Sequence, residues 1–193
     1  RRTVTTSVYL LGEPGVGRST VMGELLTPWS VGPAVVLRGD LVGEPFGDRD
    51  RIRGIHLGQS AGHRSGTETL PGSALADAVA WAHLTRALPR WVLGEGARLA
   101  HHRFLAALST RGPLLVVHLT ASPRVCASRR AAVNAALGRP ALAVGVVRTI
   151  HAQAVRVARA AQLLDGATVI TVDTERMTPA ECAEAITLVA EAL

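Results

Sequence analysis

Apolar residues recur along the chain in short runs that are bounded by glycine or by polar residues. Five of these runs have the length and the Val/Leu-rich composition of buried strands in a parallel sheet. They cover residues 8–11, 34–37, 91–93, 114–119 and 168–172. We therefore expect five parallel strands, taken in this order along the chain.

The segments that follow four of these strands predict helices. Ser122-Pro123 and Thr178-Pro179 are typical helix starts, and Glu181 completes a capping box with Thr178. The expected helices cover residues 17–26, 73–88, 98–108, 122–137, a stretch resuming near 147, and a last one from 178 onward. Residues 41–72 are rich in Gly, Arg and Asp and predict a long irregular loop, which is usually functional or mobile.

Strands that alternate with helices over the whole length predict an α/β fold. We expect a single domain over residues 1–193, with a five-stranded parallel sheet covered by helices on both faces. In such sheets ligands bind at the carboxyl ends of the strands. No apolar run approaches the ~20 residues of a membrane span.

The turn after the first strand matches the spacing of a phosphate-binding loop, G-x-x-x-x-G-K-[ST], between a strand and a helix. Its residues are Gly12, Glu13, Pro14, Gly15, Val16, Gly17, Arg18, Ser19 and Thr20. Backbone N–H groups of such a loop bind phosphate oxygens, and the Ser19 hydroxyl is placed to hold Mg²⁺. The competing interpretations are a purely structural Gly-rich turn and a dinucleotide-binding turn, although Thr20 occupies the position where the dinucleotide fingerprint requires Gly or Ala.

Arg18 stands where a P-loop ordinarily has Lys. All 21 basic side chains of this chain are Arg and none is Lys, and the formal net charge is +6. We therefore expect Arg18 to contact the β- and γ-phosphates of ATP and to keep activity. Because Arg is not equivalent to Lys at a phosphate site, a weakly active or inactive nucleotide-binding module, or an NTP hydrolase, stays open as an alternative.

Two acidic residues at predicted strand ends are candidates for chemistry. Asp40 follows the second strand and could act as the general base for an attacking hydroxyl. Glu95 ends the third strand and could hold Mg²⁺ or contact the acceptor. The alternative for Asp40 is a loop residue that caps a turn, and the alternative for Glu95 is a surface glutamate that follows a strand.

Arginines crowd the segment around the break at residues 138–145. Two helices joined by a flexible, Arg-rich piece predict a lid over approximately residues 129–148. Arg129, Arg130 and Arg148 flank the break and are the candidates to clamp the transferring phosphoryl group.

The remaining candidates concern the acceptor and the cell compartment. Arg64, Thr67 and Glu68 lie in the long loop where an acceptor would dock, and Arg98 follows the third strand. A basic surface suits phosphate-rich partners but does not by itself show nucleic-acid binding, because a nucleotide kinase also needs arginines. A nucleotide and a nucleic-acid hydroxyl are both acceptors that the sequence allows. Two widely spaced cysteines fit a reducing cytoplasm.

The whole set resembles phage and actinobacterial P-loop kinases of the polynucleotide-kinase-like and chloramphenicol-phosphotransferase-like groups. It looks most like phage thymidylate-kinase-like enzymes that phosphorylate 5-hydroxymethyluracil in DNA. The residues that carry the resemblance are 12–20, Asp40, Gly66-Thr67-Glu68, 94–99, Arg129-Arg130 and Val172-Asp173-Thr174. The chain departs from the family pattern at Arg18, where Lys is usual, and at Glu68, where Asp is expected.

The resemblance implies an ATP- and Mg²⁺-dependent kinase that transfers the γ-phosphate to a hydroxyl of a nucleotide, a modified DNA base or a small molecule. It implies that Asp40 is the general base and that Arg18 and Ser19 contact ATP and Mg²⁺. By the same resemblance Arg129 and Arg130 are lid residues, and Asp173 and Thr174 lie near the adenine.

Overall fold

A computed structural model describes residues 4–60 and 65–193 of the chain. Over these residues the strands form one eight-stranded sheet in the order β2-β4-β5-β6-β1-β7-β8, with β3 paired to β4. The strands are β1 (Thr6–Leu11), β2 (Ser30–Val31), β3 (Val35–Arg38), β4 (Leu41–Asp48), β5 (Arg51–Leu57), β6 (Trp91–Glu95), β7 (Leu114–Thr120) and β8 (Ala167–Asp173).

The sheet is mixed. Strands β5, β6, β1, β7 and β8 are parallel to one another, whereas β4 is antiparallel to β5 and to both β2 and β3. The parallel part therefore has five strands, as expected, but the whole sheet has eight strands and is not entirely parallel. Four of the five predicted strands, at residues 8–11, 91–93, 114–119 and 168–172, belong to this parallel part.

The strand predicted at residues 34–37 is the exception. It is β3, an exposed edge strand in a hairpin with β4, and three strands separate it from β1. The true second parallel strand is β5, which lies inside the stretch predicted to be an irregular loop. Gly43, Pro45 and Gly47 in β4, and charged residues in β5, hide the alternation of apolar and polar positions that identifies a strand.

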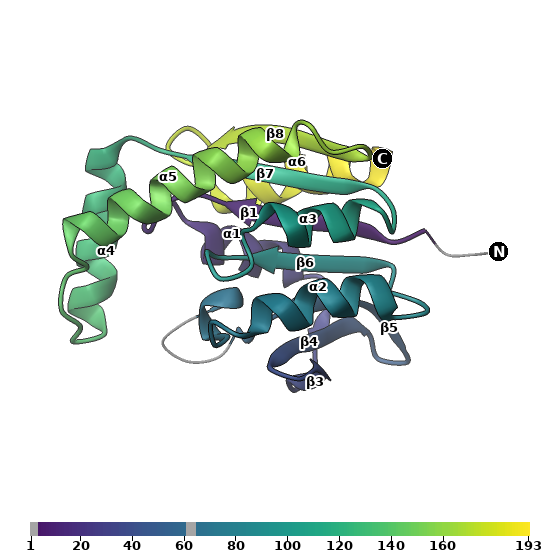
Figure 1. Ribbon diagram of the computed structural model, residues 1–193. Helices are drawn as coiled ribbons and strands as arrows, with labels where there is room; N and C mark the ends of the chain where they lie inside the picture. Colours follow the sequence, from purple (N-terminus) through teal and green to yellow (C-terminus); the bar gives the residue numbers. More distant parts are fainter. Residues whose placement is uncertain (1–3, 61–64) are drawn as a thin grey trace.

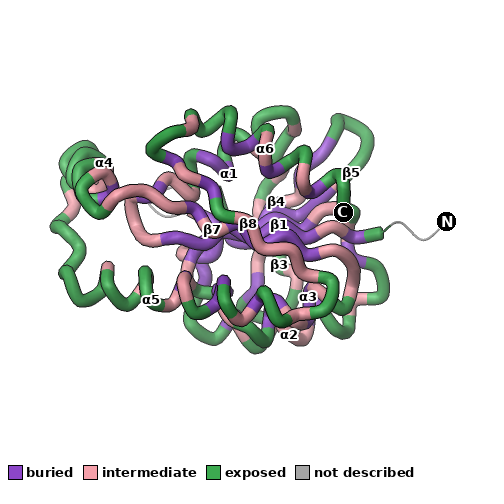
Figure 2. The backbone as a smooth tube through the Cα atoms, turned by 90° about the horizontal axis from the view of Figure 1, so that it is seen from above, coloured by how far each residue is buried: buried purple, intermediate pink, exposed green. Residues whose placement is uncertain are grey.

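The helices cover both faces of the sheet, as predicted (Figure 1). Helices α2, α3 and most of α5 lie over one face, and α1 and α6 lie over the other (Figures 1 and 2). Their bounds are α1 (Arg18–Leu26), α2 (Ala74–Leu84), α3 (His102–Ser109), α4 (Pro123–Ala136), α5 (Val144–Ala161) and α6 (Pro179–Ala192), with a 3-10 turn η1 at Thr67–Thr69. None of these helices is both long and apolar enough to cross a membrane, as judged over the described residues.

Two of the helix starts follow the sequence signals closely. Thr178 Oγ1 accepts from the Glu181 N–H at 3.3 Å, and Glu181 Oε2 accepts from the Thr178 N–H at 2.7 Å. This reciprocal pair is the predicted capping box at the start of α6. Ser122 likewise accepts from the Val125 N–H, with Pro123 in the first turn of α4.

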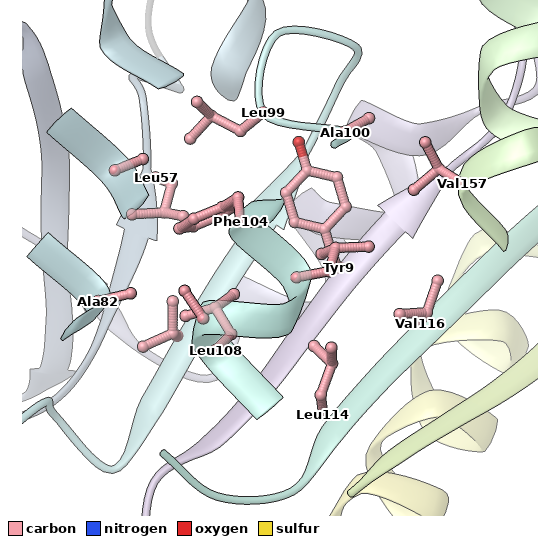
Figure 3. Close-up of a cluster of buried hydrophobic side chains, with 14 of the residues drawn as sticks. Tyr9, Leu57, Ala82, Leu99, Ala100, Phe104, Leu108, Leu114, Val116 and Val157 are labelled. Atoms are coloured by element: carbon pink, nitrogen blue, oxygen red, sulfur yellow. The ribbon is translucent and has the colours of Figure 1, made fainter. Parts of the chain in front are cut away.

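Buried side chains form one cluster on each face of the sheet. On the α2, α3 and α5 side, Tyr9 packs edge-on against Phe104 with ring centroids 6.4 Å apart. The Tyr9 hydroxyl points out of this cluster toward the loop that carries Leu99 and Ala100 (Figure 3). The core thus reaches the carboxyl edge of the sheet, where α4 and the first part of α5 extend beyond the strands (Figure 1).

Candidate functional site

The turn between β1 and α1 has the conformation of a phosphate-binding loop. Gly15 and Gly17 have φ angles of 90° and 100°, which side-chain-bearing residues rarely adopt. A Cβ atom on Gly15 would also overlap the Cys126 carbonyl oxygen. No side chain caps the start of α1 at Gly17, so its first-turn N–H groups are open to an anion.

Two arginines of α4 brace this loop. Arg130 donates to the Pro14 carbonyl oxygen at 2.6 Å, and Arg129 donates to the Val16 carbonyl oxygen at 3.3 Å. Arg129 also donates to the side-chain and backbone oxygens of Thr174, at 3.0 and 2.8 Å. The structure therefore brings Arg129 and Arg130 to the P-loop, where they bind its backbone.

Thr174 joins the end of β8 to the same loop. Its buried hydroxyl donates to the Val16 carbonyl oxygen at 2.7 Å. The neighbouring Asp173 instead accepts from the Glu175 N–H and pairs with Arg176, 3.4 Å away. Of the two residues predicted near the adenine, Thr174 is therefore the one that contacts the P-loop.

A cavity of about 850 Å³ opens between the P-loop, α4 and the turn after β8. Its size is in the range of ligand pockets. Its lining residues are Pro14 to Val21, Arg129, Arg130, Ala132, Val133, Asn134, Leu142 and Thr174 to Pro179. The lining combines charged side chains, several of them arginines, with the apolar side chains of Val133, Leu142 and Met177, and such a mixed lining suits the phosphates and the base of a nucleotide.

Ser19 meets Glu95 at the mouth of the P-loop. The Ser19 hydroxyl donates to Glu95 Oε2 at 3.1 Å and also contacts the hydroxyl of Ser65. Glu95 is only 2 % exposed, and its burial raises the pKa of its carboxyl group, an effect opposed by Arg18 and by the two hydroxyl groups. The strand register places Glu95 near Ser19, because Glu95 is the register partner of Leu10 in the neighbouring strand β1, and Leu10 lies two residues before the P-loop.

This oxygen pair fits Mg²⁺. Mg²⁺ is usually held by one or two protein oxygens together with substrate phosphates and water. Among the described residues no group of three or more His, Cys, Asp or Glu side chains is placed to hold a metal ion. A cation here would therefore bind Ser19 and Glu95 and complete its coordination with phosphate oxygens.

Arg18 reaches across the loop to Glu68 of η1. Arg18 Nη2 lies 3.7 Å from Glu68 Oε1, and the same carboxylate oxygen accepts from the Ala97 N–H at 2.7 Å. Thr67, one residue earlier, is buried and donates to the Glu95 carbonyl oxygen at 2.7 Å. The predicted acceptor residues Thr67 and Glu68 thus adjoin the P-loop and the end of β6.

The family model described as P-loop Nucleotide Kinase3 matches residues 3–150. The chain belongs to this family. The match includes the P-loop, Glu95 and α4, and it supports a nucleotide-binding phosphotransferase of the kinase class. No curated protein matches the chain.

Asp40 is not where a base of this P-loop kinase was expected. Asp40 lies in the turn between the edge strand β3 and β4, and β4 is three strand spacings from β1, which is about 14 Å at about 4.8 Å per spacing. Asp40 accepts from the Ser73 hydroxyl, and its N–H donates to Asp77 Oδ2 at 2.8 Å. Asp40 therefore contacts the start of α2, and this geometry does not support the expectation that it faces the γ-phosphate, because a short apolar run does not reveal which strand it pairs with.

The other predicted residues fall into two groups. Arg148 and Arg98 are exposed, on α5 and on the turn after β6, and their roles stay predictions. Arg64 lies outside the described residues.

A buried pair in the β4–β5 hairpin is a feature that sequence reasoning missed. Glu44 Oε2 lies 3.4 Å from His56 Nδ1 and accepts from the Ser60 N–H at 2.9 Å. Burial lowers the pKa of His56, so its imidazole is neutral near pH 7. Recognising β4 and β5 as strands would have placed His56 and Glu44 opposite each other, since they are register partners.

Proposed function

We propose that the chain is a kinase that transfers the γ-phosphate of ATP, bound with Mg²⁺, to a hydroxyl group. The observation that carries this proposal is the Ser19–Glu95 pair at the P-loop, 3.1 Å apart, with the carboxylate buried. Burying a carboxylate costs free energy unless the group is paired, and a carboxylate and a hydroxyl beside a P-loop are oxygen ligands that suit a phosphate-bound Mg²⁺ ion.

Each group of residues around the P-loop has a separate role in this proposal. The N–H groups of the P-loop and of the first turn of α1 bind the phosphates. Ser19 and Glu95 hold the cation, which when bound neutralises charge on the β- and γ-phosphates. Arg18 supplies a positive charge beside them, and the cavity under α4 holds the base and sugar.

For the acceptor we propose thymidylate or 5-hydroxymethyluracil in DNA, on the strength of the resemblance to phage kinases that modify DNA. The net charge of +6 favours such a phosphate-bearing acceptor. The turn η1 and the end of β6 form the side of the P-loop where that acceptor would bind. The role of Asp40 as base stays a prediction that the geometry does not support.

A transfer assay with γ-labelled ATP and Mg²⁺ tests this function. The acceptors are thymidylate, DNA carrying 5-hydroxymethyluracil, DNA 5′-hydroxyl ends and hydroxylated antibiotics. We expect transfer to one of them by the parent and its loss in Ser19→Ala, with Ser30→Ala, an exposed serine on β2, as the matched control. Release of phosphate to water alone would identify a hydrolase, and ATP binding without turnover would identify a nucleotide-binding module.

A further inference from the structure

The turn η1 is built to lie against the end of β6. Gly66 has a φ of 57°, and a Cβ atom there would overlap the Glu95 side chain. Thr67 donates to the Glu95 carbonyl oxygen at 2.7 Å, and the hydroxyl oxygens of Thr67 and Tyr9 lie 3.3 Å apart. These buried contacts fix η1 beside the end of β6, and Glu68 is the next residue of the same turn.

The Glu68 carboxylate has an anchor that does not depend on Arg18. Its Oε1 accepts from the Ala97 N–H at 2.7 Å, and Arg18 Nη2 approaches the same oxygen to 3.7 Å. The side chain of Arg18 is 12 % exposed and that of Glu68 is 32 % exposed. The backbone N–H of Ala97 therefore positions the Glu68 carboxylate, and this carboxylate in turn positions the Arg18 side chain.

This contact leaves most of the Arg18 guanidinium available. A separation of 3.7 Å exceeds the range of an N–H···O hydrogen bond, so the contact is an ionic one through a single nitrogen. Arginine has five N–H donors in a planar fork, and one side of the fork can face a carboxylate while the other faces phosphate. Lysine, a single ammonium on its stem, offers no comparable fork.

We propose that Glu68 is a positioning residue for Arg18: it holds one side of the guanidinium so that the other side meets the β- and γ-phosphates during transfer. The inference rests on the proposed function, because it assigns Arg18 a phosphate contact. It explains how Arg serves at a position where P-loops ordinarily have Lys. It also predicts that turnover depends on Glu68 only while residue 18 is Arg.

A double-mutant cycle tests this dependence. The four proteins are the parent, Glu68→Gln, Arg18→Lys and the double variant, and Glu184→Gln, an exposed carboxylate on α6, is the control. Glutamine keeps an oxygen for the Ala97 N–H and removes only the charge. The measurements are the Kd for Mg·ATP, by calorimetry, and the rate of ATP hydrolysis without acceptor, which needs no knowledge of the acceptor.

We expect Glu68→Gln to turn over about tenfold more slowly than the parent, a coupling typical of residues in contact. Its Kd for Mg·ATP should be unchanged or lower, since a negative charge beside the phosphates has been removed. In the Arg18→Lys background the same change should alter turnover by less than about twofold.

Three outcomes would overturn the inference. These are an equal loss of turnover in both backgrounds, turnover by Glu68→Gln that matches or exceeds the parent, and a rise in the Kd that accounts for the whole loss. A parent that neither binds nor hydrolyses ATP would contradict the proposed function itself. A parent that does both, with an additive cycle, would contradict only the role of Glu68.

Discussion

Thr174 ties the P-loop to the end of β8 through one buried hydroxyl. That hydroxyl donates to the Val16 carbonyl oxygen at 2.7 Å and accepts from Arg129 Nη1 at 3.0 Å. Thr174→Val keeps the shape of the side chain and removes both bonds, together with a longer contact to the Thr120 carbonyl oxygen at 3.3 Å. An unsatisfied buried polar group costs about 1–3 kcal/mol, so we expect the free energy of unfolding to fall by about 2 kcal/mol. The P-loop should loosen with it, and ATP should bind more weakly.

Thermal denaturation and ATP titration measure the two effects. In a domain of this size each kcal/mol shifts the Tm by about 2–4 °C, so the expected drop is about 4–8 °C. Thr171→Val, the same change at an exposed position on β8, is the matched control and should leave both quantities near the parent's. If Thr174→Val were as stable as this control and bound ATP equally well, the hydroxyl would not be what joins β8 to the P-loop.

Three further predictions concern other parts of the structure. Arg18→Lys should retain or raise ATP turnover and Arg18→Ala should lose most of it; an Arg18→Ala protein as fast as the parent would exclude Arg18 as a phosphate contact. Burial lowers the pKa of His56, so the unfolded chain takes up a proton near its ordinary pKa of about 6.5, whereas the folded chain takes one up only at a lower pH. Stability should therefore fall from pH 7.5 to 5.5, less steeply in His56→Gln, and equal slopes by urea denaturation would refute this. Amides of residues 131–149, most of which are exposed, should exchange hydrogen faster than those of β1 and slow when ATP binds; protection equal to β1 without nucleotide would contradict a lid.

Helices and strands were predictable from the sequence where their own residues carry a recognisable pattern of apolar and polar positions. The strands β1, β6 and β7 are buried along most of their length and read as continuous apolar runs, and the half-buried edge strand β8 reads as a run of β-branched residues. The capping box at Thr178 and the turn Ser122-Pro123 depend on neighbouring residues only. The β2–β5 region was not predictable in this way, because its strands pair antiparallel and carry glycine, proline and arginine at positions where an apolar residue would have identified them.

The same distinction applies to the candidate site. The P-loop is a local motif, and Glu95 could be placed because it ends a strand that is parallel and adjacent to β1. Asp40 was misplaced because its position depends on which strand β3 pairs with. The Arg18–Glu68 contact joins residues 50 positions apart through the packing of η1 on β6, and no spacing rule in the sequence indicates it.

The central claim is that Ser19 and Glu95 bind a phosphate-bound cation at the P-loop. Calorimetric titration of ATP with and without Mg²⁺, on the parent and on Glu95→Gln, tests it most directly. We expect Mg²⁺ to tighten ATP binding by the parent and to have a much smaller effect in Glu95→Gln, while binding of ATP alone stays similar. An equal effect of Mg²⁺ on both proteins, or no binding of ATP under either condition, would contradict the claim.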